Sequence, residues 1–304
     1  MNGVGAALCL MSAAAFGVLA VFGRLAFDEG VDLDALLLAR FGLAALVLVP
    51  LAAYRGSLRR LAPAQWVAGL LMGAVGYALQ SSLYFAAVRH AELSQVGLIF
   101  SCYPLLVMVA AILLRRERAT LRRWAALVVS WTGIGLVLTA GSVGTFSAVG
   151  TLYALAAASV YCAYILIGER VTERVQPIDL SALVVTGATV TFFVIGLLDG
   201  GPHLDVTPKA WLWLVLTALI STVAAIIMFF AGMARLGPST AALLGTLEPV
   251  VTVTAAGLVF HERLTPAQLA GAALVLCALV VVQGSRKSPP APAVEPLPLA
   301  AVVS

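Results

Sequence analysis

The chain has 304 residues, of which 62% are hydrophobic and 11% are charged, and its formal net charge is +4. Soluble domains carry roughly 25% charged residues, so this composition excludes an ordinary soluble protein and predicts an integral membrane protein in a lipid bilayer. The positive residues lie in short segments between apolar runs, a distribution that does not indicate a nucleic-acid partner.

Apolar runs long enough to cross the roughly 30 Å hydrocarbon core follow one another along the chain. They predict an all-α protein with ten transmembrane helices, near residues 3–23, 34–54, 65–88, 93–114, 122–140, 148–168, 179–198, 210–234, 239–260 and 265–283. The remaining segment, 285–304, is rich in proline and is expected to be a disordered cytoplasmic tail.

The two halves of the chain repeat at a fixed offset of 145 residues. Rare residue types recur at this spacing, including Trp66 with Trp211, Pro104 with Pro249, and Glu117 with Glu262. Five spans is an odd number, so the second half must insert with the opposite orientation, as in many secondary transporters. We therefore expect a five-helix repeat at 1–141, an inverted five-helix repeat at 147–284, and a central cavity between them.

Most Lys and Arg residues fall in the loops that share a membrane face with the N-terminus. The positive-inside rule then places both termini in the cytoplasm. The protein is expected in a bacterial-type inner membrane.

Two ionisable residues lie well inside predicted spans, Arg40 in the second and Glu248 in the ninth. A charge near the bilayer centre costs at least about 2.5 kcal/mol, so each needs a partner or a function. At the 145-residue offset, their counterparts are the uncharged residues Val185 and Tyr103. A substrate is not symmetric, so we expect its contacts at such mismatched positions.

A cation and an anion in one cavity suit a zwitterion, with Arg40 holding a carboxylate and Glu248 an ammonium. In the empty site, the two side chains are expected to pair with each other, which limits the cost of burial. Glu248 can also exchange a proton, so a coupled proton is a candidate partner. The alternative for Arg40 is a side chain that snorkels toward Asp32 and Asp34.

Uncharged polar residues inside the spans add a weaker signal, because several share a helix face with one another or with Glu248. The further predicted substrate contacts are Tyr77, Gln80, Ser81, Tyr84, Gln95, Tyr103 and Thr240. Interhelical hydrogen bonding or anchoring at the membrane interface is the alternative for each of them.

Pro104 and Pro249 lie inside predicted spans and are expected to kink them. Each removes a backbone donor, which leaves the carbonyls of Phe100 and Gly245 without a helical partner. The kinked helices are therefore expected to line the interior, although a kink kept for packing alone is an equal alternative.

Glu117 and Glu262 precede new spans, where a carboxylate can accept hydrogen bonds from the free N–H groups of a first helical turn. We expect them to be structural caps. Gly69, Gly73 and Gly76, and Gly133 with Gly135, are expected to be sites of close helix packing.

Enzyme chemistry is not expected from this sequence. The three histidines lie at span ends or in loops, and the four cysteines lie within apolar runs without metal-ligand spacing. No glycine-rich phosphate loop is present, so neither a metal nor a cofactor is expected.

The doubled pattern from proline to glutamate, Pro104 to Glu117 and Pro249 to Glu262, resembles the ten-helix EamA-like branch of the drug/metabolite transporter superfamily. RFGLAALVL, which Arg40 opens, and EPVVTVTAAGLVFHERLTPAQLAGAALVL are similar to the same family. The resemblance implies that spans one to four and six to nine enclose a cavity, with spans five and ten outside. The four-helix relatives use a glutamate in the first span, which this chain lacks, so their proton-exchange mechanism is not implied.

The expected function is secondary transport of small organic metabolites, amino acids or related zwitterions above all, with export favoured over import. Drugs or organic acids are the alternative substrates, and a non-transporting membrane sensor or assembly partner is the alternative function. A monomer or weak dimer is expected.

Overall fold

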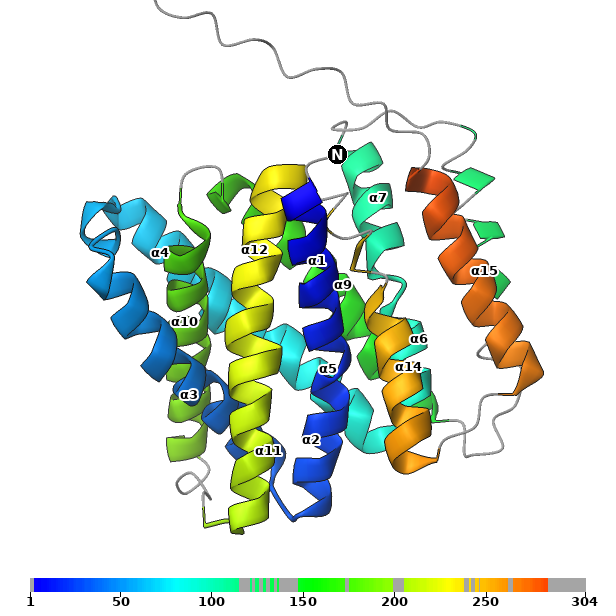
Figure 1. Ribbon diagram of the computed structural model, residues 1–304, viewed down its shortest axis with the longest axis horizontal. Helices are drawn as coiled ribbons and strands as arrows, with labels where there is room; N and C mark the ends of the chain where they lie inside the picture. Colours follow the sequence, from blue (N-terminus) through cyan, green and yellow to red (C-terminus); the bar gives the residue numbers. More distant parts are fainter. Residues whose placement is uncertain are drawn as a thin grey trace, which may run out of the picture.

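In a computed structural model, every element of regular secondary structure among the described residues is a helix (Figure 1). The described residues are 3–114, 121, 124–125, 128–129, 132–133, 136, 147–172, 175–198, 205–237, 241, 244–245, 247–261 and 265–283. The tail at 285–304, Glu117, Glu262 and Thr240 lie outside them, as does most of the predicted fifth span at 122–140.

The first half of the chain forms helices joined by short connections. They are α1 (Gly3–Gly17), α2 (Leu19–Asp28), α3 (Leu33–Tyr54), η1 (Leu58–Arg60), α4 (Pro63–Leu71), η2 (Met72–Tyr77), α5 (Ala78–His90), α6 (Leu93–Phe100) and α7 (Tyr103–Leu113). The turn η1 is a 3₁₀ helix and η2 is a π-helix.

The second half follows the same order. Its helices are α9 (Ala148–Thr172), α10 (Pro177–Leu198), α11 (Pro208–Ala218), the π-helix η3 (Leu219–Ala224), α12 (Ala225–Leu236), α14 (Leu247–Phe260) and α15 (Pro266–Gln283). Four helices of the chain begin at a proline, namely α4, α10, α11 and α15. Proline suits a first turn because the backbone N–H that it lacks would have no acceptor within the helix there.

Among the described residues, six helices are long and apolar enough to cross a membrane when directly joined segments are counted as one. They are Gly3–Asp28, Leu33–Tyr54, Pro63–His90, Ala148–Val171, Pro177–Leu198 and Pro208–Leu236. A helix satisfies all its backbone donors and acceptors internally, which is what a hydrocarbon environment demands. The expectation of an all-helical membrane protein is confirmed.

The predicted first and fourth spans are interrupted. The first is divided at Val18 into α1 and α2, and the fourth is divided at Ser101 and Cys102 into α6 and α7. The Ser101 hydroxyl donates to the carbonyl of Gly97 at 2.6 Å, so a side chain takes up one acceptor at the break.

Pro104 and Pro249 lie at the starts of new helices, and not inside continuous ones as the prediction of a kink had assumed. Pro104 occupies the first turn of α7, and Pro249 is the third residue of α14. The carbonyl of Gly245, expected to lack a partner, accepts a hydrogen bond from the Glu248 amide at 2.9 Å. A new helix start removes the problem that an internal proline would create, because first-turn amides need no partner within the helix.

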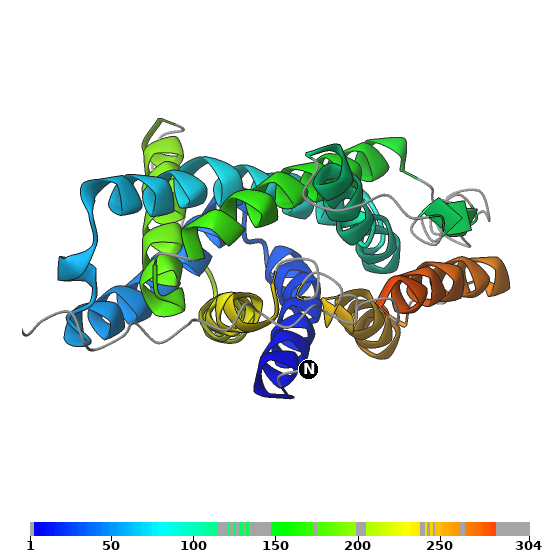
Figure 2. The same cartoon turned by 90° about the horizontal axis from the view of Figure 1, so that it is seen from above.

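The helices lie in two rows (Figure 2). In one row, α1 packs against α12 on one side and α14 on the other. In the other row, α9 packs against α5, α6 and α7. The pair α3 and α10 packs together and closes one end of the arrangement.

Two glycines allow α10 to approach α4 and η2 closely. A Cβ at Gly69 would lie 2.7 Å from Leu183 Cδ1, and a Cβ at Gly73 would overlap the carbonyl of Val184. Small residues let helix backbones approach each other in membranes, where dispersion contacts drive association. The expectation that these two glycines are packing sites is confirmed.

Polar contacts join distant segments at opposite ends of the helices. Near the end of α2, Glu29 Oε1 lies 2.6 Å from Lys209 Nζ, and Glu29 Oε2 accepts a hydrogen bond from the Thr207 hydroxyl. The hydrogen bond from Lys209 lowers the pKa of the Glu29 carboxyl. Toward the other end, the Ser57 hydroxyl donates to Asp179 at 2.7 Å, at the start of α10.

Candidate functional site

Arg40 lies on α3 in the interior of the protein, where its side chain is 1% exposed. Its Nε donates to Thr222 Oγ1 at 2.7 Å and its Nη2 to Tyr77 at 3.0 Å, with a longer contact of 3.5 Å from Nη1 to Ser81. The side chain therefore does not snorkel toward Asp32, because its donors are directed to hydroxyl groups inside the bundle.

The hydroxyl partners of Arg40 come from the two π-helical turns. Tyr77 ends η2 and Thr222 lies in η3, and the difference 222 − 77 is the repeat offset of 145. The Thr222 hydroxyl donates to the carbonyl of Thr217 at 2.9 Å, five residues earlier, so its oxygen is free to accept from Arg40. Short π-helical turns of this kind are frequent at functional sites.

Aromatic rings surround the guanidinium. Its central carbon lies 4.7 Å from the ring centre of Phe41, 5.5 Å from that of Tyr77 and 5.7 Å from that of Phe85. Ring faces carry partial negative charge and so stabilise a cation that has been removed from water.

The charge of Arg40 is nevertheless not neutralised locally. Over the described part of the chain, Arg40 makes no ion pair, and its contacts are with neutral hydroxyls and rings. Those contacts use three of the five N–H groups of a guanidinium. Two N–H groups, one on each terminal nitrogen, are left for another acceptor.

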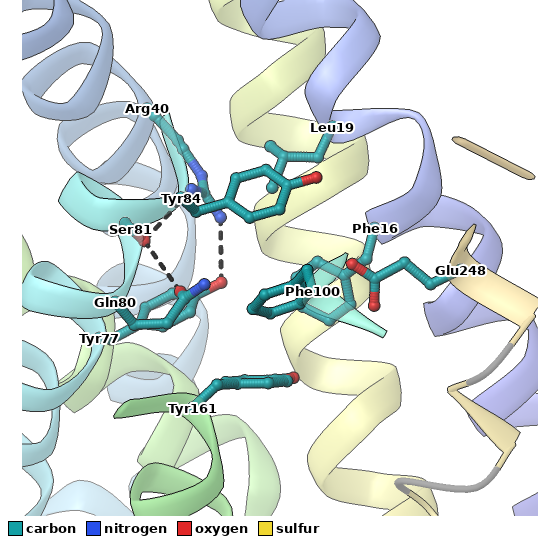
Figure 3. A pocket seen from close by; sticks show the side chains of 10 residues that line it. All are labelled: Phe16, Leu19, Arg40, Tyr77, Gln80, Ser81, Tyr84, Phe100, Tyr161 and Glu248. Carbon is teal, nitrogen blue, oxygen red and sulfur yellow. Dashed lines mark hydrogen bonds between the residues drawn. The ribbon is translucent and has the colours of Figure 1, made fainter. Parts of the chain in front are cut away.

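Glu248 lies on the opposite wall of the same pocket (Figure 3). It belongs to the first turn of α14 and is 9% exposed. The positive end of a helix dipole favours a carboxylate at this position, which partly offsets the cost of burying it. The expected ion pair with Arg40 is not formed, because the two side chains belong to different walls and Arg40 is held by hydroxyls on its own side.

The start of α14 is fixed against the break between α1 and α2. The Thr252 hydroxyl contacts the carbonyl of Gly17 at 2.9 Å and that of Glu248 at 3.0 Å. A Cβ at Gly17 would lie 2.9 Å from the Glu248 carbonyl oxygen. The backbone that carries the carboxylate is therefore pressed directly against the interrupted first helix.

The pocket encloses about 340 Å³ of empty space, including its opening. Its ten lining residues come from α1, α2, α3, η2, α5, α6, α9 and α14. They are Phe16, Leu19, Arg40, Tyr77, Gln80, Ser81, Tyr84, Phe100, Tyr161 and Glu248.

Six of the predicted site residues therefore meet around one space. These are Arg40, Tyr77, Gln80, Ser81, Tyr84 and Glu248. Tyr103 is buried behind the wall, with its ring centre 4.9 Å from that of Tyr161, and Gln95 is buried but does not line the pocket.

Sequence reasoning did not include Phe16, Leu19, Phe100 and Thr222 among the site residues, and Tyr161 shared a face of the sixth predicted span with Tyr153 and Tyr164, where packing was an equal alternative. Phe16, Leu19 and Phe100 belong to apolar helix faces that look the same whether they face a pocket or a neighbouring helix. Thr222 had a usable signal, since it is the repeat counterpart of Tyr77 and differs from it chemically.

The chemistry available in the pocket is binding by charge, hydrogen bonds and aromatic faces. No group of three or more His, Cys, Asp or Glu side chains that could hold a metal occurs among the residues searched, which are those the structure describes. Phe100 and Tyr161 stack with ring centres 5.5 Å apart, and Tyr161 and Tyr164 with centres 5.9 Å apart. Phe100 and Tyr161 therefore give the pocket an aromatic lining.

Comparison with known proteins finds similarity to transporters. The model of the EamA-like transporter family matches residues 3–139 and 148–283. An uncharacterized transporter of Synechocystis sp. is 28% identical over 63% of this chain, and the match spans 59% of that protein's length. An uncharacterized transporter of Bacillus subtilis is 23% identical, with 82% of this chain and 84% of that protein covered.

A crystal structure of another protein has a similar fold. It aligns with a TM-score of 0.71 at 19% sequence identity and covers 93% of this chain and 97% of the other. At this identity, the similarity concerns the fold alone.

Proposed function

The chain belongs to the EamA-like transporter family, and from this premise we propose that it carries small zwitterionic metabolites, such as amino acids, across the inner membrane by alternating access. The observation that carries the proposal is a buried cation and a buried anion on facing walls of one pocket, without an ion pair between them. Removing two charges from water costs several kcal/mol each. A ligand with a carboxylate and an ammonium would compensate both.

Each charge has a defined role in this proposal. The two N–H groups of Arg40 that are not bound by hydroxyls or rings suit a substrate carboxylate, because the planar guanidinium can donate two parallel hydrogen bonds. Glu248 would accept from the substrate ammonium, and it is also the candidate group for coupling transport to a proton. Gln80 and Ser81 add polar groups beside Arg40 that fix orientation.

The proposed architecture is ten spans in two inverted repeats, 1–141 and 147–284, with both termini in the cytoplasm. It is supported by packing pairs that are equivalent at the 145-residue offset. The pair α1 with α12 corresponds to α9 with α5, and α1 with α14 corresponds to α9 with α7. A pseudo-twofold axis in the membrane plane would relate these pairs.

A topology experiment tests the architecture. In a cysteine-free protein in intact cells, Ser142→Cys is expected to react with a membrane-impermeant thiol reagent, whereas Ser57→Cys is expected to react after the membrane is opened. The reason is that the odd number of spans between the two positions puts them on opposite faces. Labelling of Ser57→Cys alone in intact cells would reject the inverted arrangement.

The function itself is tested by counterflow in reconstituted vesicles. Vesicles preloaded with one unlabelled amino acid at a time should accumulate the same labelled compound, and protein-free vesicles serve as the control. Counterflow requires no coupling ion and does not depend on the direction of transport in the cell, so it detects an exporter as well as an importer. Exchange of organic acids or of cationic drugs alone would change the substrate class, and the absence of exchange by folded protein across a broad metabolite panel would favour a sensor or assembly role.

A further inference from the structure

Two glycine–phenylalanine contacts occupy equivalent positions in the two halves. Gly23 on α2 faces the ring of Phe85 on α5, where a Cβ would lie 3.1 Å from Cδ1 and from Cζ. Gly168 on α9 faces the ring of Phe230 on α12, where a Cβ would lie 3.8 Å from Cε1. Adding 145 to 23 and 85 gives 168 and 230, so one contact is the repeat counterpart of the other.

Both phenylalanines are 0% exposed and lie just beyond the pocket. The ring of Phe85 is 5.7 Å from the guanidinium carbon of Arg40. The ring of Phe230 is 6.3 Å from Tyr164, whose ring is 5.9 Å from the pocket residue Tyr161. Neither phenylalanine lines the pocket, so the substrate contacts proposed above do not include them.

The two contacts lie toward opposite ends of the protein. Phe85 lies five residues before the end of α5 at His90, and Gly23 lies five residues before the end of α2 at Asp28. Phe230 lies in the middle of α12, six residues before Leu236, and Gly168 lies four residues before the end of α9 at Thr172. The ends of α2 and α12 lie at opposite ends of the bundle in Figure 1. The end at which α2 stops at Asp28 is called the Asp28 end here, and the end at which α12 stops at Leu236 is called the Leu236 end.

Each contact also joins the two rows of helices. The row with α1, α2 and α12 supplies Gly23 and Phe230, and the row with α5 and α9 supplies Phe85 and Gly168. A tilt of one row against the other would separate one contact while it compresses the other. A ring resting on a bare glycine backbone is held by individually weak dispersion contacts, so it can leave and return without breaking hydrogen bonds.

We infer that Phe85 and Phe230 are the two gating residues of the transport reaction, each closing one end of the pocket against its glycine. The inference deepens the proposed transport function and rests on it. The two gates are not identical. The Cε atoms of Met72 and Met233 lie closer to a Cβ at Gly168 than the ring does, at 3.2 and 3.7 Å. The ring of Phe85 rests directly on Gly23, so the gate at the Asp28 end is the tighter one.

The gates are tested by the accessibility of a pocket residue, which requires no substrate. Ser81→Cys is placed in a protein whose four native cysteines are replaced by alanine, and labelling rates with an impermeant thiol reagent are measured from each membrane face. We expect Phe85→Ala to raise the rate about tenfold from the Asp28 end, and Phe230→Ala to raise it similarly from the Leu236 end, because each loses the contacts that favour its closed state.

Phe192→Ala is the matched control. Phe192 is buried and stacks on Phe41 with ring centres 5.7 Å apart. Its replacement by alanine therefore removes a similar amount of packing at a position away from both gates. If an alanine variant does not fold, Gly23→Ala and Gly168→Val separate the same contacts by adding volume. Increased labelling from the same face for both gate variants, no increase, or an equal increase for Phe192→Ala would overturn the inference.

The result is separable from the proposed function. One-sided labelling in a protein that exchanges no solute would leave the gates standing and reject transport. Solute exchange by wild-type protein without one-sided labelling would reject the gates alone.

Discussion

Replacing Arg40 by lysine is expected to lower the affinity for carboxylate substrates by about 10- to 100-fold, since a hydrogen bond to a charged group contributes about 1.5–3 kcal/mol. Lysine keeps the positive charge but has no planar fork, and its ammonium cannot reach Thr222, Tyr77 and a substrate carboxylate together. The affinity is measured as the half-saturating concentration in counterflow.

Arg24→Lys is the matched control for this substitution. Arg24 is 41% exposed and pairs with Asp28 one helical turn away, a contact that contributes little at a surface. A second comparison uses the decarboxylated amine of the best amino-acid substrate, which keeps the ammonium but lacks the carboxylate. A variant that has lost only the carboxylate contact should bind this amine as the wild type does. If Arg40→Lys weakens the amine as much as the parent amino acid, Arg40 organises the two π-helical turns and does not hold the carboxylate.

Replacing Glu248 by glutamine is expected to give the second large effect, a loss of about tenfold or more in affinity for substrates that carry an ammonium. The side chain keeps its shape and its place in the first turn of α14, but it can no longer neutralise a cation. Organic acids of the same size should lose much less, because Arg40 remains. Asp34→Asn, which neutralises an exposed carboxylate at the start of α3, is the control.

The same variant separates substrate binding from proton coupling. If Glu248 carries only a proton, Glu248→Gln should retain counterflow at wild-type affinity and lose accumulation driven by a pH gradient. If it binds the ammonium, counterflow itself should weaken. Wild-type behaviour in both assays would assign Glu248 a structural role at the break between α1 and α2, where its carbonyl already contacts Thr252.

Much of the candidate site was predictable from two properties of the sequence. Charges are expensive inside apolar runs, which marked Arg40 and Glu248. Four polar neighbours on the third span completed a set of six residues that do line the pocket. The 145-residue repeat also explains why the partners of Arg40, Tyr77 and Thr222, come from equivalent turns.

The ion pair between Arg40 and Glu248 was wrongly expected, for a reason of placement. Burial makes a charged group require a partner, but composition does not specify which partner. The hydroxyls of Tyr77 and Thr222 reach Arg40 because η3 packs against α3, and because Tyr77, at the end of η2, packs its ring edge-on against Phe41 of α3. The backbone of Gly17 and the hydroxyl of Thr252 hold the start of α14 on the other wall.

The sequence by itself determined that this protein is helical, lies in a membrane and carries buried charges, because insertion depends on the composition and length of each segment taken alone. The tertiary structure decided where the helices break and which faces meet. In a helix that is apolar on every side, the sequence pattern does not show which face points inward. Phe16, Phe100 and Tyr161 therefore line the pocket because of how the two rows of helices pack together.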